Sequence, residues 1–130
     1  MKLPDNTDLY ETPISIHWFD ENGIMCATSK KVERTIEHYE EVMKLYKRFI
    51  DGGDKLCLLA DASDTMPMSK EVREYVTAEM PKYIKAHAVI SKEPLLSSLS
   101  NTFMNLSWAG FPVKLFSNVD EAKQWLKEYL

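Results

Sequence analysis

The chain has 130 residues, of which 45 % are apolar and 28 % charged, a composition typical of one globular domain spanning residues 1–130. Its net charge of -4 at pH 7 supplies no basic excess, so nucleic acid is not an expected partner. Residues 1–11 carry no apolar stretch typical of a secretion signal, and no apolar run approaches the length of a membrane span. We therefore expect a cytoplasmic protein without a transmembrane segment, loosely ordered over residues 1–7.

A β-hairpin is the first predicted element. Residues 8–20 carry apolar side chains in alternate positions over their second half, which predicts one strand. Residues 21–23 end in a glycine that tolerates positive φ, and a second apolar stretch, 24–29, follows at once. The alternating side chains of the first strand are Ile14, Ile16 and Trp18.

Helical and strand patterns then alternate to the end of the chain. Apolar residues three or four apart predict helices, and short continuous apolar runs predict strands that are covered on both faces. The predicted helices are residues 35–51, 69–84, 94–106 and 118–129, and the predicted strands are 55–62, 86–91 and 113–116. Pro81 predicts a kink or a break in the second helix just before it.

This order of elements predicts an α/β fold. Alternating strands and helices need right-handed crossovers, which give a largely parallel sheet. We expect a mixed, mostly parallel, five-stranded sheet with an N-terminal antiparallel hairpin and four main helices. The apolar strand 55–62 is expected at its centre.

No pattern of reactive residues predicts catalysis, a metal site or a cofactor. The histidines at 17, 38 and 87 include no pair at metal-ligand spacing, and no glycine-rich loop precedes a helix. Cys26 and Cys57 lie within apolar runs, so we expect reduced packing residues rather than nucleophiles. The expectation is a non-enzymatic protein.

The polar loop 61–69 is a candidate site because it leaves the carboxyl end of the predicted central strand and enters a helix. Asp61 is expected to accept hydrogen bonds in the turn, with a catalytic or metal-binding carboxylate as the alternative. Ser69 is expected to cap the helix, with a phosphate acceptor as the alternative. An enzyme would need a cleft that gathers Asp61, Ser63 and His87.

The segment 95–111 carries more apolar side chains than one narrow helical stripe requires. They either complete the core or form a surface for a partner or an apolar ligand. Methionines beside the polar loop either fill gaps or line an adaptable pocket. The candidate ligand or partner residues are Asp61, Ser63, Thr65, Met66, Met68, Met80, Leu99, Phe103 and Trp108.

Four features resemble the SpoIIAA-like proteins, small bacterial domains related to STAS and compared with the lipid-binding CRAL-TRIO fold. They are the hairpin, the strand 56–61 after a glycine-ended helix, the strand 86–91 and the ending 112–126, which reads PVKLFSNVDEAKQWL. The resemblance implies a β-α superhelix with a mixed sheet and a non-enzymatic regulatory or binding role. STAS antagonists carry a phosphorylatable serine where Ser69 stands, although the Asp-Ser-Ser-Gly setting is absent here.

Two functions are expected from these observations. The leading one is a cytoplasmic regulatory or protein-interaction module, which binds a protein partner or forms a homodimer through its sheet edge. The alternative is a carrier or sensor of a small apolar ligand or lipid, bound beside the kink at Pro81.

Overall fold

The computed structural model describes residues 1–63, 66–91 and 110–130, and it contains one six-stranded sheet in the order β1-β2-β3-β4-β5-β6. The strands are β1 (Tyr10–Glu11), β2 (Ser15–Phe19), β3 (Met25–Ser29), β4 (Leu56–Asp61), β5 (Ile84–Ile90) and β6 (Val113–Phe116). β1, β2 and β3 pair antiparallel, and β3 to β6 pair parallel. The predicted mixed, mostly parallel α/β sheet with an antiparallel start is confirmed.

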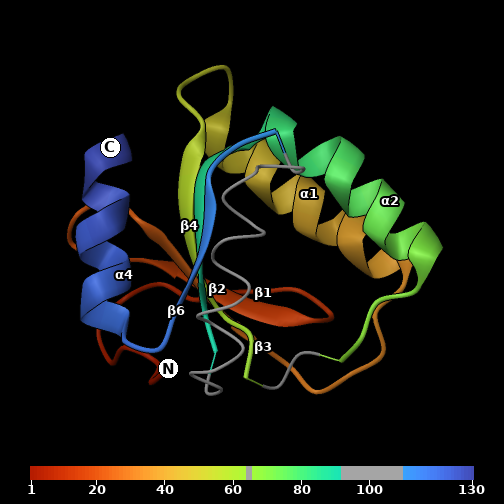
Figure 1. Ribbon diagram of the computed structural model, residues 1–130, viewed down its shortest axis with the longest axis horizontal. Coiled ribbons are helices and arrows are strands. Elements are labelled where there is room, and N and C mark those ends of the chain that lie inside the picture. The colour runs from red at the N-terminus through yellow and green to blue at the C-terminus, as the bar shows by residue number, and fades with distance from the viewer. Residues whose placement is uncertain (64–65, 92–109) are drawn as a thin grey trace.

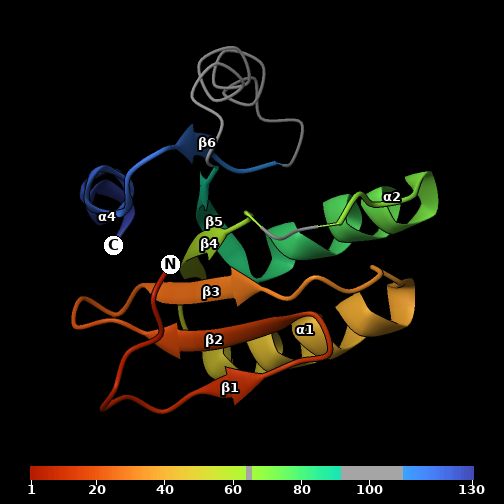
Figure 2. The same ribbon diagram turned by 90° about the horizontal axis from the view of Figure 1, so that it is seen from below.

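Helices cover both faces of this sheet. α1 (Ile36–Ile50) and α2 (Lys70–Glu79) lie on one face, and α4 (Val119–Leu126) lies on the other (Figures 1 and 2). Short 3-10 helices, Met80–Lys82 and Lys127–Tyr129, follow α2 and α4. None of the helices in the described parts of the chain is long and apolar enough to cross a membrane.

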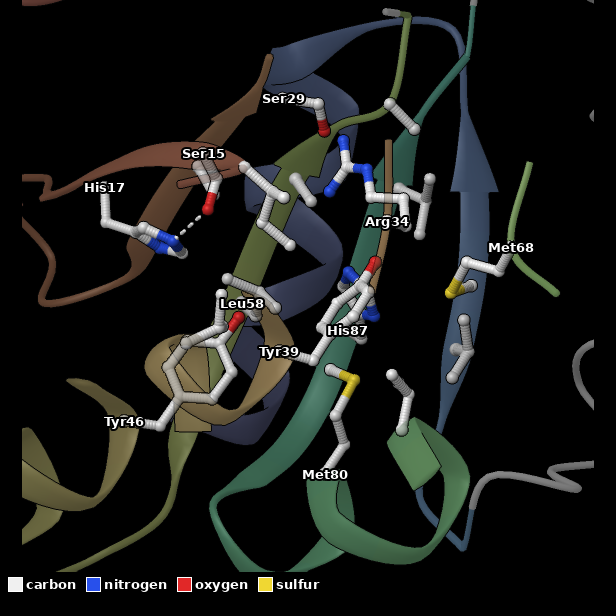
Figure 3. A pocket seen from close by; sticks show the side chains of 18 of the residues that line it. Ser15, His17, Ser29, Arg34, Tyr39, Tyr46, Leu58, Met68, Met80 and His87 are labelled. Atoms are coloured by element: carbon white, nitrogen blue, oxygen red, sulfur yellow. Dashed lines mark hydrogen bonds between the residues drawn. The ribbon is translucent and has the colours of Figure 1, made fainter. Parts of the chain in front are cut away.

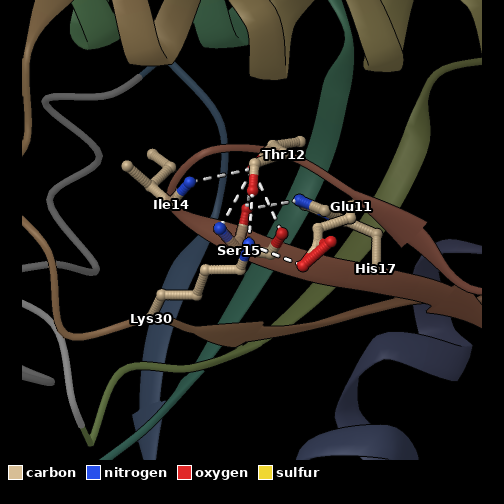
Figure 4. Close-up of polar contacts among 6 residues, drawn as sticks. All are labelled: Glu11, Thr12, Ile14, Ser15, His17 and Lys30. Carbon is tan, nitrogen blue, oxygen red and sulfur yellow. Dashed lines mark hydrogen bonds and ion pairs between the residues drawn. The ribbon is translucent and has the colours of Figure 1, made fainter.

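The number of strands differs from the prediction, because the stretch 8–20 forms two strands instead of one. Pro13 has no N–H to donate, which interrupts the ladder between β1 and β2. The Thr12 hydroxyl holds the resulting turn by accepting from the backbone N–H of Ser15 at 3.0 Å and of Ile14 at 3.3 Å (Figure 4). The sheet therefore has six strands where five were expected.

Side-chain caps fix the helix starts largely where the sequence placed them. The Thr35 hydroxyl accepts from the N–H of His38 at 3.1 Å, and Asn118 accepts from the N–H of Glu121 at 3.1 Å. At the end of α1 the left-handed conformation begins at Asp51, at φ 33°, one residue before the glycine pair expected to supply it.

Pro81 ends the regular part of the second helix, as predicted. α2 stops at Glu79 and the chain continues as a 3-10 turn with the proline inside it. The predicted helix 94–106 lies outside the described residues.

The apolar run of β4 supplies two cores at once. Leu58 packs with α1 residues in one cluster, whereas Cys57 and Leu59 pack with α4 residues in the other. Cys26 is also buried on the α4 face, and both thiols are free. Burial raises the pKa of the Cys26 thiol to about 12, which keeps it protonated and inert.

Leu59→Ala should lower the free energy of unfolding by about 3 kcal/mol, because the leucine is fully buried and its removal leaves a void beneath α4. Leu130→Ala removes the same atoms from a side chain that is 54 % exposed and should change the free energy by less than about 0.5 kcal/mol. Urea unfolding of both variants measures the difference. Similar small losses would contradict the assignment of Leu59 to a core.

Candidate functional site

A cavity of about 270 Å³ lies between the sheet and the pair α1 and α2 (Figure 3). Small side chains on this face of the central strands create it: Ala27 on β3, and Ala60 and Ala62 at the end of β4. An alanine side chain is too short to reach the helices from the sheet, and larger side chains normally fill such space in protein interiors. The opposite wall is formed by larger side chains, among them Val42 of α1 and Val76 of α2.

A short chain of hydrogen bonds runs from the β1–β2 turn into the cavity. The Thr12 and Ser15 hydroxyls lie 2.8 Å apart, and the Ser15 hydroxyl lies 2.7 Å from Nε2 of His17 (Figure 4). His17 is 1 % exposed, and its Nδ1 has no hydrogen-bond partner among the described residues. Burial lowers the pKa of His17 to about 4, so its imidazole is neutral near pH 7.

A second histidine reaches the cavity from β5. His87 is half-buried because its ring borders the cavity, yet its Nε2 atom is buried and finds no hydrogen-bond partner in the described chain. Burial lowers the pKa of His87 to about 4 as well. Each neutral imidazole therefore leaves one ring nitrogen free to donate to or accept from a ligand.

Two tyrosines of α1 complete the polar part of the wall. The ring of Tyr46 meets the ring of His17 edge to face, with centroids 5.8 Å apart. Burial raises the pKa of both Tyr46 and Tyr39, and at Tyr39 the positive charge of Arg34 and a side-chain hydrogen bond with Arg34 oppose this effect. Both phenols stay neutral at pH 7 and present hydroxyl groups beside apolar ring surface.

Arg34 is the charged residue among the described side chains that line this cavity. It precedes α1 and is only 7 % exposed. One terminal nitrogen donates to the backbone carbonyl of Lys30 at 3.2 Å, whereas Nε is buried without a partner in the described chain. In Figure 3 its side chain projects into the space bordered by Ser29 and Tyr39.

The Ser15–His17 pair has the spacing of a nucleophile and its base, but not the supporting chemistry. No described acid hydrogen-bonds to Nδ1 of His17, and an imidazole with a pKa near 4 is a weak base at neutral pH. No described group of histidine, cysteine and acidic residues could hold a metal ion. Among the described residues, the Ser15–His17 pair therefore lacks the acid that orients the histidine of a catalytic triad.

The structure separates the residues that the sequence had grouped as one candidate site. Met68 and Met80 do line the cavity. Asp61 points to the opposite face of β4, where it accepts from Ser63 N–H at 3.0 Å, from the Ser63 hydroxyl at 2.6 Å, and from the amino group of Met1. Met66 is exposed. Thr65, Leu99, Phe103 and Trp108 lie outside the described residues.

Ser69 caps α2, accepting from the N–H of Val72 at 3.3 Å. It borders a shallow hollow between the starts of α1 and α2 that is also lined by Glu33, Glu37 and Glu71. Arg34 borders the same hollow, so its lining residues carry charges of both signs. The phosphate-acceptor role stays a prediction that this mixed charge does not decide.

The enzyme alternative required Asp61 and His87 in one cleft. β5 does pair with β4, but Asp61 pairs with Ile90 and His87 pairs with Leu58. Because successive side chains of a strand point to opposite faces, Asp61 shares the α4 side with Leu59, whereas His87 faces the cavity with Leu58. These two groups do not form a common site.

Sequence reasoning missed Ser15, His17 and Arg34 as cavity residues. The alternation pointed to the apolar positions Ile16 and Trp18, and Trp18 packs in the cluster beneath α4. β2 is covered on both faces, so the alternation has two inward sides and His17 occupies the second. Arg34 lies in a charged loop and has no sequence signal of burial.

The two cavity histidines should make stability depend on pH. In the unfolded chain their pKa is 6.5, and in the folded protein it is about 4, so between these values the unfolded chain binds more protons. The free energy of unfolding should therefore fall from pH 7 to pH 5. The fully buried His17 should contribute about 2 kcal/mol to this fall, and His87 at the cavity wall should contribute less. Urea midpoints at both pH values measure this fall.

His17→Gln should reduce this fall, and a His17→Gln/His87→Gln double variant should reduce it further, because glutamine does not titrate. Buried carboxylates contribute equally to all three proteins. An unchanged fall in the variants would show that the histidines are not responsible.

The fold is similar to that of a solved structure. A solved structure from Shewanella loihica PV-4, an uncharacterized protein of the DUF3478 family with a SpoIIAA-like fold, superposes with a TM-score of 0.63. The match covers 96 % of this chain and 99 % of that chain at 16 % identity, which shows the fold alone. The SpoIIAA-like resemblance seen in the sequence is thereby supported.

No curated protein matches the chain. A family model described as a domain of unknown function, DUF7793, matches residues 17–130, which include Arg34 and both cavity histidines. The chain therefore belongs to the DUF7793 family.

Proposed function

We propose that this protein binds a small, largely apolar ligand in the cavity between the sheet and the helices α1 and α2, as a carrier or a sensor. The cavity itself is the observation that supports the proposal. Its volume of about 270 Å³ is close to the lower limit of ordinary small-molecule sites. Most of its wall is aliphatic or aromatic, with a few polar groups from different elements directed inward, the usual composition of a ligand site.

Packing energetics favour an occupant. Close-packed interiors contain few voids larger than a water molecule, and atoms that line an empty void lose dispersion contacts. Alanines at 27, 60 and 62 keep this space open, although a larger aliphatic residue at any of them would fill part of it. A ligand would restore the lost contacts.

The described surface offers less support for a purely protein-binding role. Its exposed large apolar side chains are few, namely Leu3, Leu9, Val32, Met66 and Leu130. β1 and β6 are the edges of the described sheet, and unpaired edges are where another chain could add a strand. A regulatory or protein-interaction role and a homodimer stay predictions, and both are compatible with a ligand-dependent sensor.

Octan-1-ol is a suitable uncharged probe for this cavity. An apolar cavity of about 150 Å³ accommodates benzene, roughly 25 Å³ for each heavy atom, so about 270 Å³ accommodates about ten heavy atoms. We expect saturable binding by isothermal titration calorimetry. Ala60→Leu should weaken it by about tenfold or more, because the added atoms occupy ligand volume.

Ala78→Leu is the matched control, since it adds the same atoms at an exposed position of α2 and should leave octanol binding unchanged. Ala60→Leu should also keep or raise the unfolding temperature, because it fills empty space. Absence of octanol binding to the unmodified protein, or equal binding to Ala60→Leu, would overturn the proposed function.

A further inference from the structure

Arg34 places a permanent positive charge at the wall of a cavity whose other described lining residues are uncharged near pH 7. Its side chain is 7 % exposed, and a guanidinium group stays protonated inside proteins. The hydrogen bond from one terminal nitrogen to the Lys30 carbonyl anchors the group, while the buried Nε has no partner in the described chain. Part of its donor fork is therefore unsatisfied.

No described acidic side chain neutralises this charge. None of the ion pairs found among residues 1–63, 66–91 and 110–130 includes Arg34, and none of the described residues lining the cavity is acidic. Glu33 and Glu37 border the outer hollow that Arg34 also touches, but no ion pair joins them to it. Arg34 interacts with the Lys30 carbonyl and the Tyr39 hydroxyl but pairs with no described anion, so a bound anion would offset part of the cost of burying its charge.

The geometry points to a small monocarboxylic acid as the ligand, with its carboxylate paired to the guanidinium of Arg34 and an apolar body of about ten heavy atoms in the cavity. This inference rests on the proposed function and names its ligand class. A planar carboxylate can accept two parallel N–H bonds from an arginine fork, which fits a group whose Nε–H is unused.

The charge balance of the site favours one negative charge. His17 and His87 are neutral near pH 7, so they supply hydrogen-bonding nitrogens and no additional positive charge. A dianionic phosphate would leave one charge uncompensated in an apolar cavity, and a ligand ammonium would be repelled by Arg34. A monocarboxylate leaves the site neutral.

Octanoate and octan-1-ol test the charge separately from the cavity, because they share the same alkyl chain. Octanoate should bind the unmodified protein roughly 10- to 100-fold more tightly than octanol, the range expected for a hydrogen-bonded charge pair. Octylammonium should bind more weakly than octanol. Isothermal titration calorimetry at pH 7 measures all three dissociation constants.

Arg34→Gln should abolish the preference for octanoate, so that octanoate and octanol bind the variant with dissociation constants within about threefold of each other. Saturable octanol binding to the variant shows that it keeps its cavity. Arg73→Gln is the matched control, since it removes the same charge from an exposed position of α2 and should keep the full preference. Arg34→Lys should retain part of the preference, because lysine keeps the charge and loses the planar fork.

The outcomes separate this inference from the proposed function. If octanol binds as tightly as octanoate, or if Arg34→Gln keeps the preference, the carboxylate inference is wrong and the apolar cavity function remains. If neither octanoate nor octanol binds the unmodified protein, both are wrong.

Discussion

Helices cover both faces of the six-stranded sheet, so each inner strand has to supply side chains to two separate cores (Figure 1). On the α4 face, Trp18 of β2 and Leu59 of β4 pack together with small residues such as Ala88 of β5. On the other face, Ala27 of β3 and Ala60 of β4 line the cavity. Short side chains at these two positions leave space between the sheet and the helices α1 and α2, and this space is the candidate binding site.

The polar groups of the cavity depend on how this sheet begins. Pro13 interrupts the first strand, and the Thr12 hydroxyl closes the turn and contacts the Ser15 hydroxyl, which in turn contacts His17. The turn between β1 and β2 thereby fixes the position of the buried His17 imidazole. Burial keeps His17 and His87 neutral, so Arg34 supplies the charge among the described residues of the cavity wall.

The described residues of the loop after β4 make turn and capping hydrogen bonds, although ligand sites often occur at the carboxyl ends of parallel strands. Asp61 accepts hydrogen bonds on the α4 face, and Ser69 caps α2 beside three glutamates. The polar side chains of the candidate site lie instead beneath α1 and α2, and they belong to four different segments of the chain. The SpoIIAA-like neighbour shares the fold at 16 % identity, and identity this low carries no information about the occupants of such a cavity.

The sequence by itself determined the elements and the fold class. Periodicity, caps and turn residues are local properties, so the hairpin, the central strand, the break at Pro81 and the capped final helix were all predictable and are all present. The extra strand was missed because a single proline divides what the alternation presents as one run. Met68 and Met80 were the cavity residues that composition suggested.

Only the tertiary structure decided which face each side chain occupies. A strand buried on both sides has no polar face to orient its alternation, so nothing in the sequence separated His17 from Trp18 or Asp61 from Ala60. The burial of Arg34 likewise depends on how its loop packs between the sheet and α1, which no local pattern records. The site could not be predicted from the sequence, because small side chains on strands far apart in the chain leave a cavity only when the fold brings those strands together.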